Sequence, residues 1–206
     1  MEYAVSIGIG YLLGSLNPAA LIARLKKQNI RASGTKNLGA TNVMMHFGKG
    51  FGALVMLFDV FKAAGAVWIV RWIFPEIALV GILGGCAAVM GHIFPFYLKF
   101  KGGKGLAAFG GMVLGVNPFS FLVLLIFCSA LILIVNYSVF MPVTAAILFP
   151  LLLWLRTGDP IAALVALLTG GVLIFKFREN LVKVKNRTEV KVRGFLSGKQ
   201  KTEKSE

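Results

Sequence analysis

The sequence predicts an all-α fold: a polytopic membrane protein with seven transmembrane helices, forming a single integral membrane domain over residues 1–206. Of these 206 residues, 57% are hydrophobic and 15% are charged, and the mean hydropathy is +0.81. Soluble domains carry about 25% charged residues. The apolar residues also fall into runs of the length that a helix needs to cross a bilayer, about 20 residues.

Seven apolar runs are separated by charges or by turn residues. Six of them are long enough to span as helices, at 3–23, 51–74, 77–98, 119–135, 139–155 and 161–177. The seventh run, 105–116, is too short to cross the bilayer upright, because a helix rises only about 1.5 Å per residue. We expect its loops to complete the crossing. Turn residues mark the breaks at 75–76, 117–118, 136–137 and 156–160.

Positive charge gathers in three segments that face the same side. Of the 22 Lys and Arg residues, six lie at 24–49, three at 99–104 and ten at 176–204. Two and then four predicted spans separate these segments, which places all three on one side. Basic loops face the cytoplasm, so we expect that side to be cytoplasmic.

The net charge of +14 is therefore a property of one face, which attracts anionic membrane lipids. A nucleic acid partner is not expected, and residues 193–206 are expected to form a disordered cytoplasmic tail. Cys86 and Cys128 lie in different apolar runs without a CxxC pair or a histidine at ligand spacing. We expect no disulfide, no metal and no cofactor.

The first candidate segment is "RASGTKNLGATNVMMHFGKG", residues 31–50. Its glycines allow a ligand to approach the backbone closely. The side chains of Ser33, Thr35, Asn37, Thr41 and Asn42 can donate hydrogen bonds to an anion such as phosphate. The alternative is a plain connector rich in turns.

The second segment, "FKGGKG" at 100–105, places Lys104 among glycines just before an apolar run. Backbone N–H groups and the positive end of a helix can converge there on an oxyanion. The spacing is not that of a Walker A loop, so ATP is not implied. The alternative is a basic anchor at the membrane surface, and His92 upstream is either a helix-end residue or a ligand contact.

The third segment, "FKFRENLVKVKNRTEVK" at 175–191, holds Arg178 and Asn180 at the membrane surface, where basic side chains are common. Asp59 and Lys62 lie inside a span at positions i and i+3, on one helical face. Charges in a membrane are costly unless paired, so we predict an intramembrane pair. It is either structural or part of the wall of a polar cavity.

In this order, the motifs S-G…N-x-G-A-T-N, G-H-x-F-P…F-K-G-G-K-G and R-E-N…T-E resemble those of the PlsY family, the bacterial acyl-phosphate-dependent glycerol-3-phosphate acyltransferases. The resemblance covers nearly the whole chain. It implies a multi-pass enzyme of the bacterial plasma (inner) membrane, with its active site facing the cytoplasm. The enzyme would move a fatty acyl group from acyl phosphate to the 1-hydroxyl of glycerol 3-phosphate, giving lysophosphatidic acid, and we expect a monomer.

The resemblance also implies roles for the polar residues. The catalytic candidates are Lys104, Ser33 and Asn180. The candidates for binding phosphate or the acceptor are Gly34, Asn37, Gly39, Thr41, Asn42, His92, Lys101, Gly102, Gly103, Gly105 and Arg178. Acyl phosphate is already activated, so positioning and charge neutralisation can drive the transfer without an enzyme nucleophile, and the sequence shows no nucleophile–base pair.

The chain departs from the family pattern at several positions. Thr35 and Lys36 form a two-residue insertion before Asn37. Met45 stands where the family has an arginine, and Phe177 where it has a histidine. Two other functions therefore stay open: a paralogue that acylates another phosphorylated or polyol acceptor, and a non-catalytic protein that binds or transports lipid.

Overall fold

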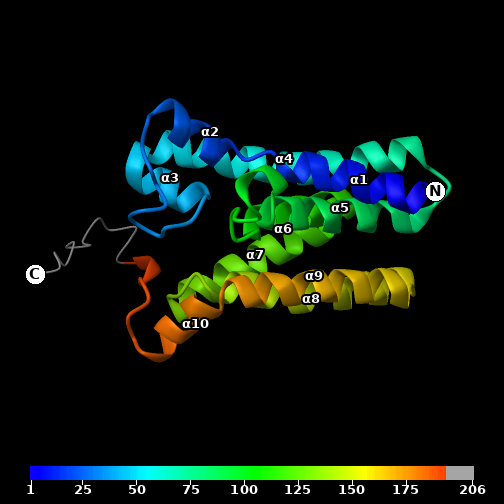
Figure 1. Cartoon of the computed structure of the whole chain (residues 1–206). Coiled ribbons are helices and arrows are strands. Elements are labelled where there is room, and N and C mark those ends of the chain that lie inside the picture. The colour runs from blue at the N-terminus through cyan, green and yellow to red at the C-terminus, as the bar shows by residue number, and fades with distance from the viewer. Residues whose placement is uncertain (194–206) are drawn as a thin grey trace, which may run out of the picture.

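The computed structural model describes residues 1–193, and every regular element in that part of the chain is a helix (Figure 1). The elements are α1 (Glu2–Ser15), α2 (Pro18–Leu25), α3 (Ala40–Phe47), α4 (Lys49–Ile73), α5 (Ala78–Ile93), the 3₁₀ turn η1 (Phe96–Leu98), α6 (Leu106–Val116), α7 (Pro118–Val135), α8 (Phe140–Thr157), α9 (Pro160–Lys176) and α10 (Arg178–Lys185).

Five segments have the length and hydropathy to cross a bilayer. They are Glu2–Leu25, Lys49–Ile73, Ala78–Leu98, Pro118–Val135 and Phe140–Thr157. The pair α9 and α10, bent by 53°, makes a sixth if it is counted as one span. The predicted all-helical membrane fold is confirmed, and five helical segments, or six with the bent pair, are long and apolar enough to span. The run expected to be the seventh is α6, whose 11 residues extend only about 16 Å at the standard helical rise.

Arg71 of α4 fixes the end of this short helix. Its Nη1 donates to the carbonyl oxygens of Gly115 at 3.2 Å and Val116 at 3.0 Å, which lack partners within the helix. Asn117 then caps α7, because its Oδ1 accepts the N–H of Ser120 at 2.7 Å. The side chains of Arg71 and Asn117 thus hold the turn between α6 and α7.

The helices α1 and α5 pack closely against each other. A Cβ added to Gly10 would lie 2.1 Å from the carbonyl oxygen of Gly84, and one added to Gly14 would lie 2.0 Å from that of Ala88. Glycines four residues apart allow two membrane helices to approach until their backbones touch. On its other side, α5 packs against α4, α6 and α9, and buried residues such as Phe109 fill the space.

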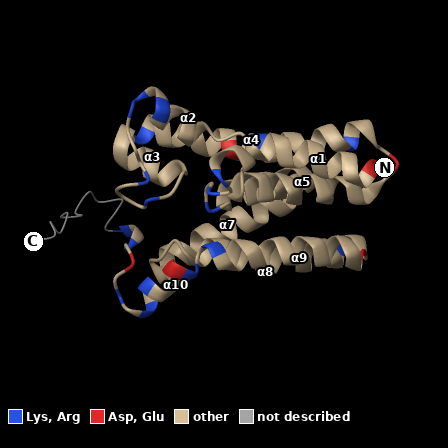
Figure 2. Ribbon diagram, viewed as in Figure 1, with Lys and Arg blue, Asp and Glu red and all other residues tan. Residues whose placement is uncertain are grey.

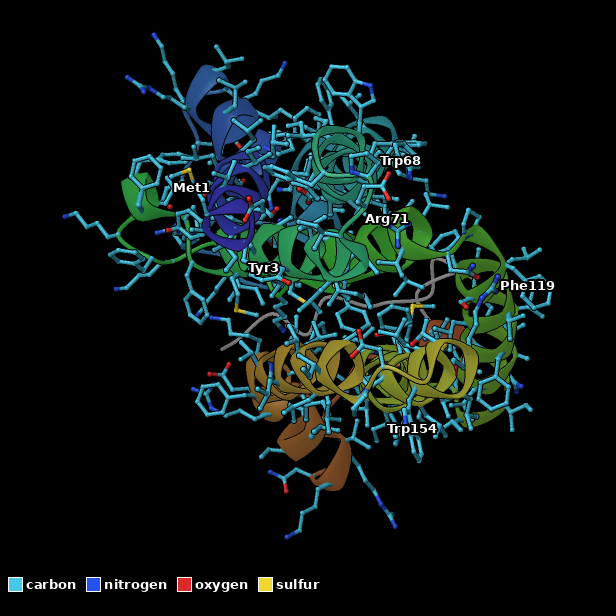
Figure 3. All side chains as sticks on the ribbon, turned by 90° about the vertical axis from the view of Figure 1, so that its right-hand side faces the viewer. Met1, Tyr3, Trp68, Arg71, Phe119 and Trp154 are labelled. Carbon is cyan, nitrogen blue, oxygen red and sulfur yellow. The ribbon has the colours of Figure 1, made fainter. Side chains whose placement is uncertain are left out.

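The two ends of the bundle differ in character. Lys and Arg residues gather at the end that carries the α2–α3 loop, the loop before α6, and α10 (Figure 2). Figure 3 looks onto the opposite end, where Trp68, Phe119 and Trp154 are 47%, 68% and 52% exposed. Aromatic side chains favour the membrane–water interface, so this end fits a second bilayer surface.

Arg193, the last residue that the structure describes, packs against the end of the bundle where Lys and Arg residues gather, called the charged end below. The backbone N–H of Arg193 donates to Asn136 Oδ1 at 2.9 Å, and its Nη2 donates to the Leu133 carbonyl at 2.8 Å. Apart from Arg193, the tail expected at 193–206 lies outside the described residues.

Candidate active site

The three polar segments predicted from the sequence meet at the charged end of the bundle. The guanidinium of Arg31 donates to the carbonyl oxygen of Lys101, which joins the first segment to the second. Lys104 Nζ donates to Asn180 Oδ1, which joins the second to the third. Lys104 therefore lies where all three come together, although the residues in these two contacts are 70 and 76 positions apart along the chain.

Lys104 is half-buried among polar and aromatic groups. Its ammonium lies 5.0 Å from the centroid of the Phe177 ring, and its partner Asn180 donates through Nδ2 to Glu189 at 2.8 Å. Burial lowers the pKa of Lys104 below its ordinary value, although Glu189 and Glu179 oppose the shift. A cation that is partly removed from water interacts more strongly with an anion than one in bulk solvent.

The glycines before Lys104 allow the loop to lie directly on the end of α5. The N–H of Gly102 donates to the carbonyl of Ile93 at 3.0 Å, and that of Gly103 donates to the carbonyl of His92 at 3.1 Å. These two amides are already paired, so the expectation that they point at an oxyanion is wrong. Because these glycines lack side chains, the loop can approach the backbone of α5 closely. A Cβ on Gly102 would lie 2.1 Å from the His92 carbonyl oxygen.

The amides that remain for an anion are those at the start of α6. Gly105 has φ 95°, in the left-handed region that suits glycine, and precedes α6 without a side-chain cap. The first-turn amides of a helix have no partner within the helix, and its N-terminus attracts negative charge. Together with Lys104, this N-terminus makes an anion-binding arrangement.

The predicted pair of Asp59 and Lys62 is present behind this loop and includes His92 as a third member. Lys62 Nζ lies 2.6 Å from Asp59 Oδ1, His92 Nδ1 lies 3.2 Å from the same oxygen, and Lys62 Nζ also donates to the Leu16 carbonyl at 2.5 Å. The three residues are 2%, 8% and 3% exposed in chain order. Buried charges need such partners.

The position of His92 differs from the substrate contact expected for it. The ring is buried and lies against the loop, because a Cβ added to Gly103 would be 2.0 Å from His92 Nε2. His92 therefore supports the loop from inside the bundle and does not face solvent at the surface.

In the first segment, Asn42 closes the loop from within. Its Oδ1 accepts the N–H of Thr35 at 2.9 Å, and its Nδ2 donates to the Ile30 carbonyl at 2.5 Å. Asn42 is only 1% exposed, which again differs from the predicted substrate contact. Thr41 and Ser33 are exposed, and Asn37 and Gly39 are partly so.

His46 is a polar residue of this end that the sequence did not single out. Its Nε2 lies 2.8 Å from Ser33 Oγ, and its Nδ1 lies 2.8 Å from the carbonyl oxygen of Asn42. Asn42 and His46 are neighbours on α3 at i and i+4, a spacing visible in the sequence. Ser33 comes from the loop, and no local pattern points to that contact.

Arg178 is placed differently from the other predicted anion contacts. Its guanidinium is exposed, stacks 4.1 Å from the Phe175 ring centroid and donates to the Phe175 carbonyl at 3.0 Å. It thus packs on the end of α9, whereas Lys104 packs on Asn180 and Phe177.

The arrangement can hold a phosphate group at the membrane surface. It provides one half-buried cation and a helix N-terminus, and the apolar helices beside it extend into the bilayer. Among residues 1–193, no group of three or more His, Cys, Asp or Glu is placed to hold a metal ion. Fold and site together define an integral membrane protein with a candidate phosphate-binding site at one end of its helix bundle.

Comparison with known proteins agrees with this class. Residues 4–187 match the family model described as glycerol-3-phosphate acyltransferase, and the chain belongs to that family. The glycerol-3-phosphate acyltransferase of Allorhizobium ampelinum is 36% identical over 190 residues, covering 91% of this chain and 90% of the relative. That of Thermosipho melanesiensis is 34% identical over 203 residues, covering 98% and 99%.

Solved structures are similar over the same length. The crystal structure of PlsY (YgiH), an integral membrane glycerol 3-phosphate acyltransferase, in its glycerol 3-phosphate form, has a TM-score of 0.88 at 30% identity and covers 97% of this chain and 100% of that one. The lysophosphatidic acid form has a TM-score of 0.82 at 31% identity, covering 93% and 95%.

Proposed function

We propose that the protein transfers a fatty acyl group from acyl phosphate to the 1-hydroxyl of glycerol 3-phosphate, giving lysophosphatidic acid for phospholipid synthesis. The observation that carries this proposal is the position of Lys104, half-buried beside the N-terminus of α6 and held by Asn180. Both substrates carry a phosphate. Lys104 can present positive charge to that phosphate at the point where the three polar segments meet.

The reaction needs little chemistry from the protein. The acceptor oxygen bonds to the acyl carbon and gives up its proton to water or to phosphate. The bond from that carbon to the phosphate oxygen breaks, and the electron pair leaves on phosphate. Negative charge on the leaving phosphate grows during this step. A fixed cation and helix amides that are already oriented stabilise that charge without reorganising, and the acyl chain can stay among the apolar helices.

The proposal places this site on the cytoplasmic side of the bacterial inner membrane and has the chain act as a monomer, with α6 and its loops as the seventh crossing. The orientation is supported by the positive charge: 19 of the 22 Lys and Arg residues fall in the sequence segments 24–49, 99–104 and 176–204, and basic loops stay in the cytoplasm.

Labelling of engineered cysteines tests this orientation. In a chain without Cys86 and Cys128, cysteines placed at 36, 101 and 190 should resist a membrane-impermeant reagent in intact cells, whereas those at 76 and 159 should react. Permeabilised cells provide the control, since positions 36, 101 and 190 should react there. Labelling of 36 and 101 in intact cells would contradict the proposed topology.

The acyl donor gives a second test. Purified protein with glycerol 3-phosphate should form product with acyl phosphate, and product with acyl-CoA should be negligible. The reason is that phosphate is the leaving group that the Lys104 site can stabilise. The measurement is radiolabelled acyl transfer with matched acyl chains, and efficient transfer from acyl-CoA alone would contradict the mechanism.

A further inference from the structure

An open cavity of about 460 Å³ lies beside α2 at the charged end of the bundle. Its walls are one face of α2, which carries Ala20 and Ala23, the loop that follows α2, and Leu98 of η1. Lys104 and its partner Asn180 are not part of these walls. The cavity is therefore a second candidate site, next to the one described above.

Three basic side chains line this cavity: Arg24, Lys27 and Arg31. The sequence from 24 to 49 contains no Asp or Glu. Within residues 1–193, the ion pairs involve only Glu2 and Asp59 as acids, and neither pairs with the basic residues of the cavity. The positive charge of the cavity is thus not neutralised by the protein, which suits an anionic ligand.

The backbone of Lys27 is unusual for a lysine. Its φ is 53°, and it follows α2 in a Schellman-type ending: its N–H donates to the Arg24 carbonyl at 3.1 Å, and the N–H of Gln28 donates to the Ala23 carbonyl at 2.9 Å. Glycine is the usual residue at this position because it adopts the left-handed conformation without strain. The chain instead places a cation there, and strained backbone of this kind often marks a functional position.

Arg31 is held against the cavity by its own loop. Its N–H donates to Asn29 Oδ1 at 3.1 Å, and the neighbouring Ile30 is only 1% exposed. One nitrogen of the guanidinium, Nη2, donates to the Lys101 carbonyl. A guanidinium has several further N–H donors, and these can hold phosphate oxygens at the same time.

The cavity lies at the level where a membrane has its phosphate groups. The first spanning segment, Glu2–Leu25, ends beside it, so the basic residues at 24 and 27 fall at the boundary between apolar and polar surroundings. On the same helix, Leu21 and Leu25 are 58% and 73% exposed. A ligand at this place meets positive charge and an apolar surface together.

We propose that this cavity binds the headgroup of an anionic membrane phospholipid. The phosphate lies among Arg24, Lys27 and Arg31, and the acyl chains lie along the exposed leucines of α2. A small soluble phosphate would use the charge alone, whereas a phospholipid also covers the apolar surface of α2. The binding is noncovalent and does not depend on acyl transfer, so it extends beyond the function proposed above.

Native mass spectrometry of the purified protein, titrated with phosphatidylglycerol in a neutral detergent, tests the site. The variant Arg24→Gln/Lys27→Gly should bind the lipid roughly 25-fold more weakly, taking about fivefold for each basic side chain at an anionic surface. It should keep the melting temperature of the parent, since glycine suits the φ of position 27. Arg31 stays unchanged because it also contacts Lys101.

The matched control is Lys49→Gln/Lys185→Gln, which removes the same charge from two exposed positions outside the cavity walls. This control should change the affinity less than twofold. An equal loss in both double variants would overturn the proposal, because general surface charge would then explain the binding. Equal binding of zwitterionic phosphatidylcholine, or displacement of the lipid by inorganic phosphate at a similar concentration, would also overturn it.

Crosslinking gives the position of the lipid independently of its affinity. Phosphatidylglycerol with a photoreactive group in its acyl chain should label α2 around Leu21 and Leu25 in the parent and in the control variant. The label on α2 should fall strongly in Arg24→Gln/Lys27→Gly. Labelling that spares α2 in the parent, or that stays the same in this variant, would contradict the proposed site.

Discussion

Replacing Lys104 with alanine is expected to lower the rate of acyl transfer by about 100- to 1000-fold. The estimate comes from removal of one fixed group that stabilises growing charge, which costs about 2.7–4 kcal/mol in the transition state. The fold should remain, because Lys104 is only half-buried and lies in the loop before α6. Initial rates and the melting temperature of the purified protein measure the two effects separately.

Two comparisons make this result specific. Lys185→Ala removes an exposed lysine from the end of α10 and should change neither rate nor stability. Lys104→Arg keeps a positive charge and should retain more activity than Lys104→Ala. A rate close to that of the parent in Lys104→Ala would show that this lysine is only a basic anchor.

The pH dependence follows from the same residue. Because burial lowers the pKa of Lys104, its charge is present below that pKa and is lost at a pH below the ordinary lysine range. The parent rate should therefore decline on the alkaline side earlier than an exposed lysine would dictate. In Lys104→Arg this decline should move to higher pH, since arginine stays charged.

Gly103→Ala is expected to have the second large effect, a loss of about 100-fold in kcat. A Cβ at this position would lie 2.0 Å from His92 Nε2 and 2.9 Å from the Leu38 carbonyl oxygen. His92 cannot easily yield because Asp59 holds its ring. The loop must move instead, and a displacement near 1 Å can cost about 100-fold in rate.

The matched control is Gly171→Ala on α9, where an added Cβ meets nothing within 4 Å. This variant should keep the parent rate and melting temperature, whereas Gly103→Ala should lose both activity and some stability through overpacking. Parent-like kinetics in Gly103→Ala would mean that the buried cluster does not position the Lys104 loop.

Hydropathy and charge were sufficient to predict the apolar helices α4 to α9, because a membrane span must be long, apolar and bounded by charged or turn residues. The short helices α3 and α10 were not predicted. The same signals could not predict how α6 ends. The helix ends where the guanidinium of Arg71, more than 40 positions away, donates hydrogen bonds to its last carbonyl oxygens.

The site was predictable at the level of segments but less so at the level of atoms. Glycines and lysines identified the Lys104 loop, since bare backbone and charge rarely gather by chance between spans. Which groups face inward depends on contacts between distant segments. Asn42 and the amides of Gly102 and Gly103 proved to be used internally, and the Ser33–His46 contact became visible only when the loop folded back onto α3.

The most direct test of the account is acyl transfer by the purified protein from radiolabelled acyl phosphate to a panel of acceptors. The panel should include glycerol 3-phosphate, glycerol and other phosphorylated polyols, because Met45 and Phe177 replace polar residues of the family pattern. We expect label to appear in lysophosphatidic acid, with glycerol 3-phosphate as the preferred acceptor. Transfer to another acceptor in its place, or no transfer at all, would contradict it.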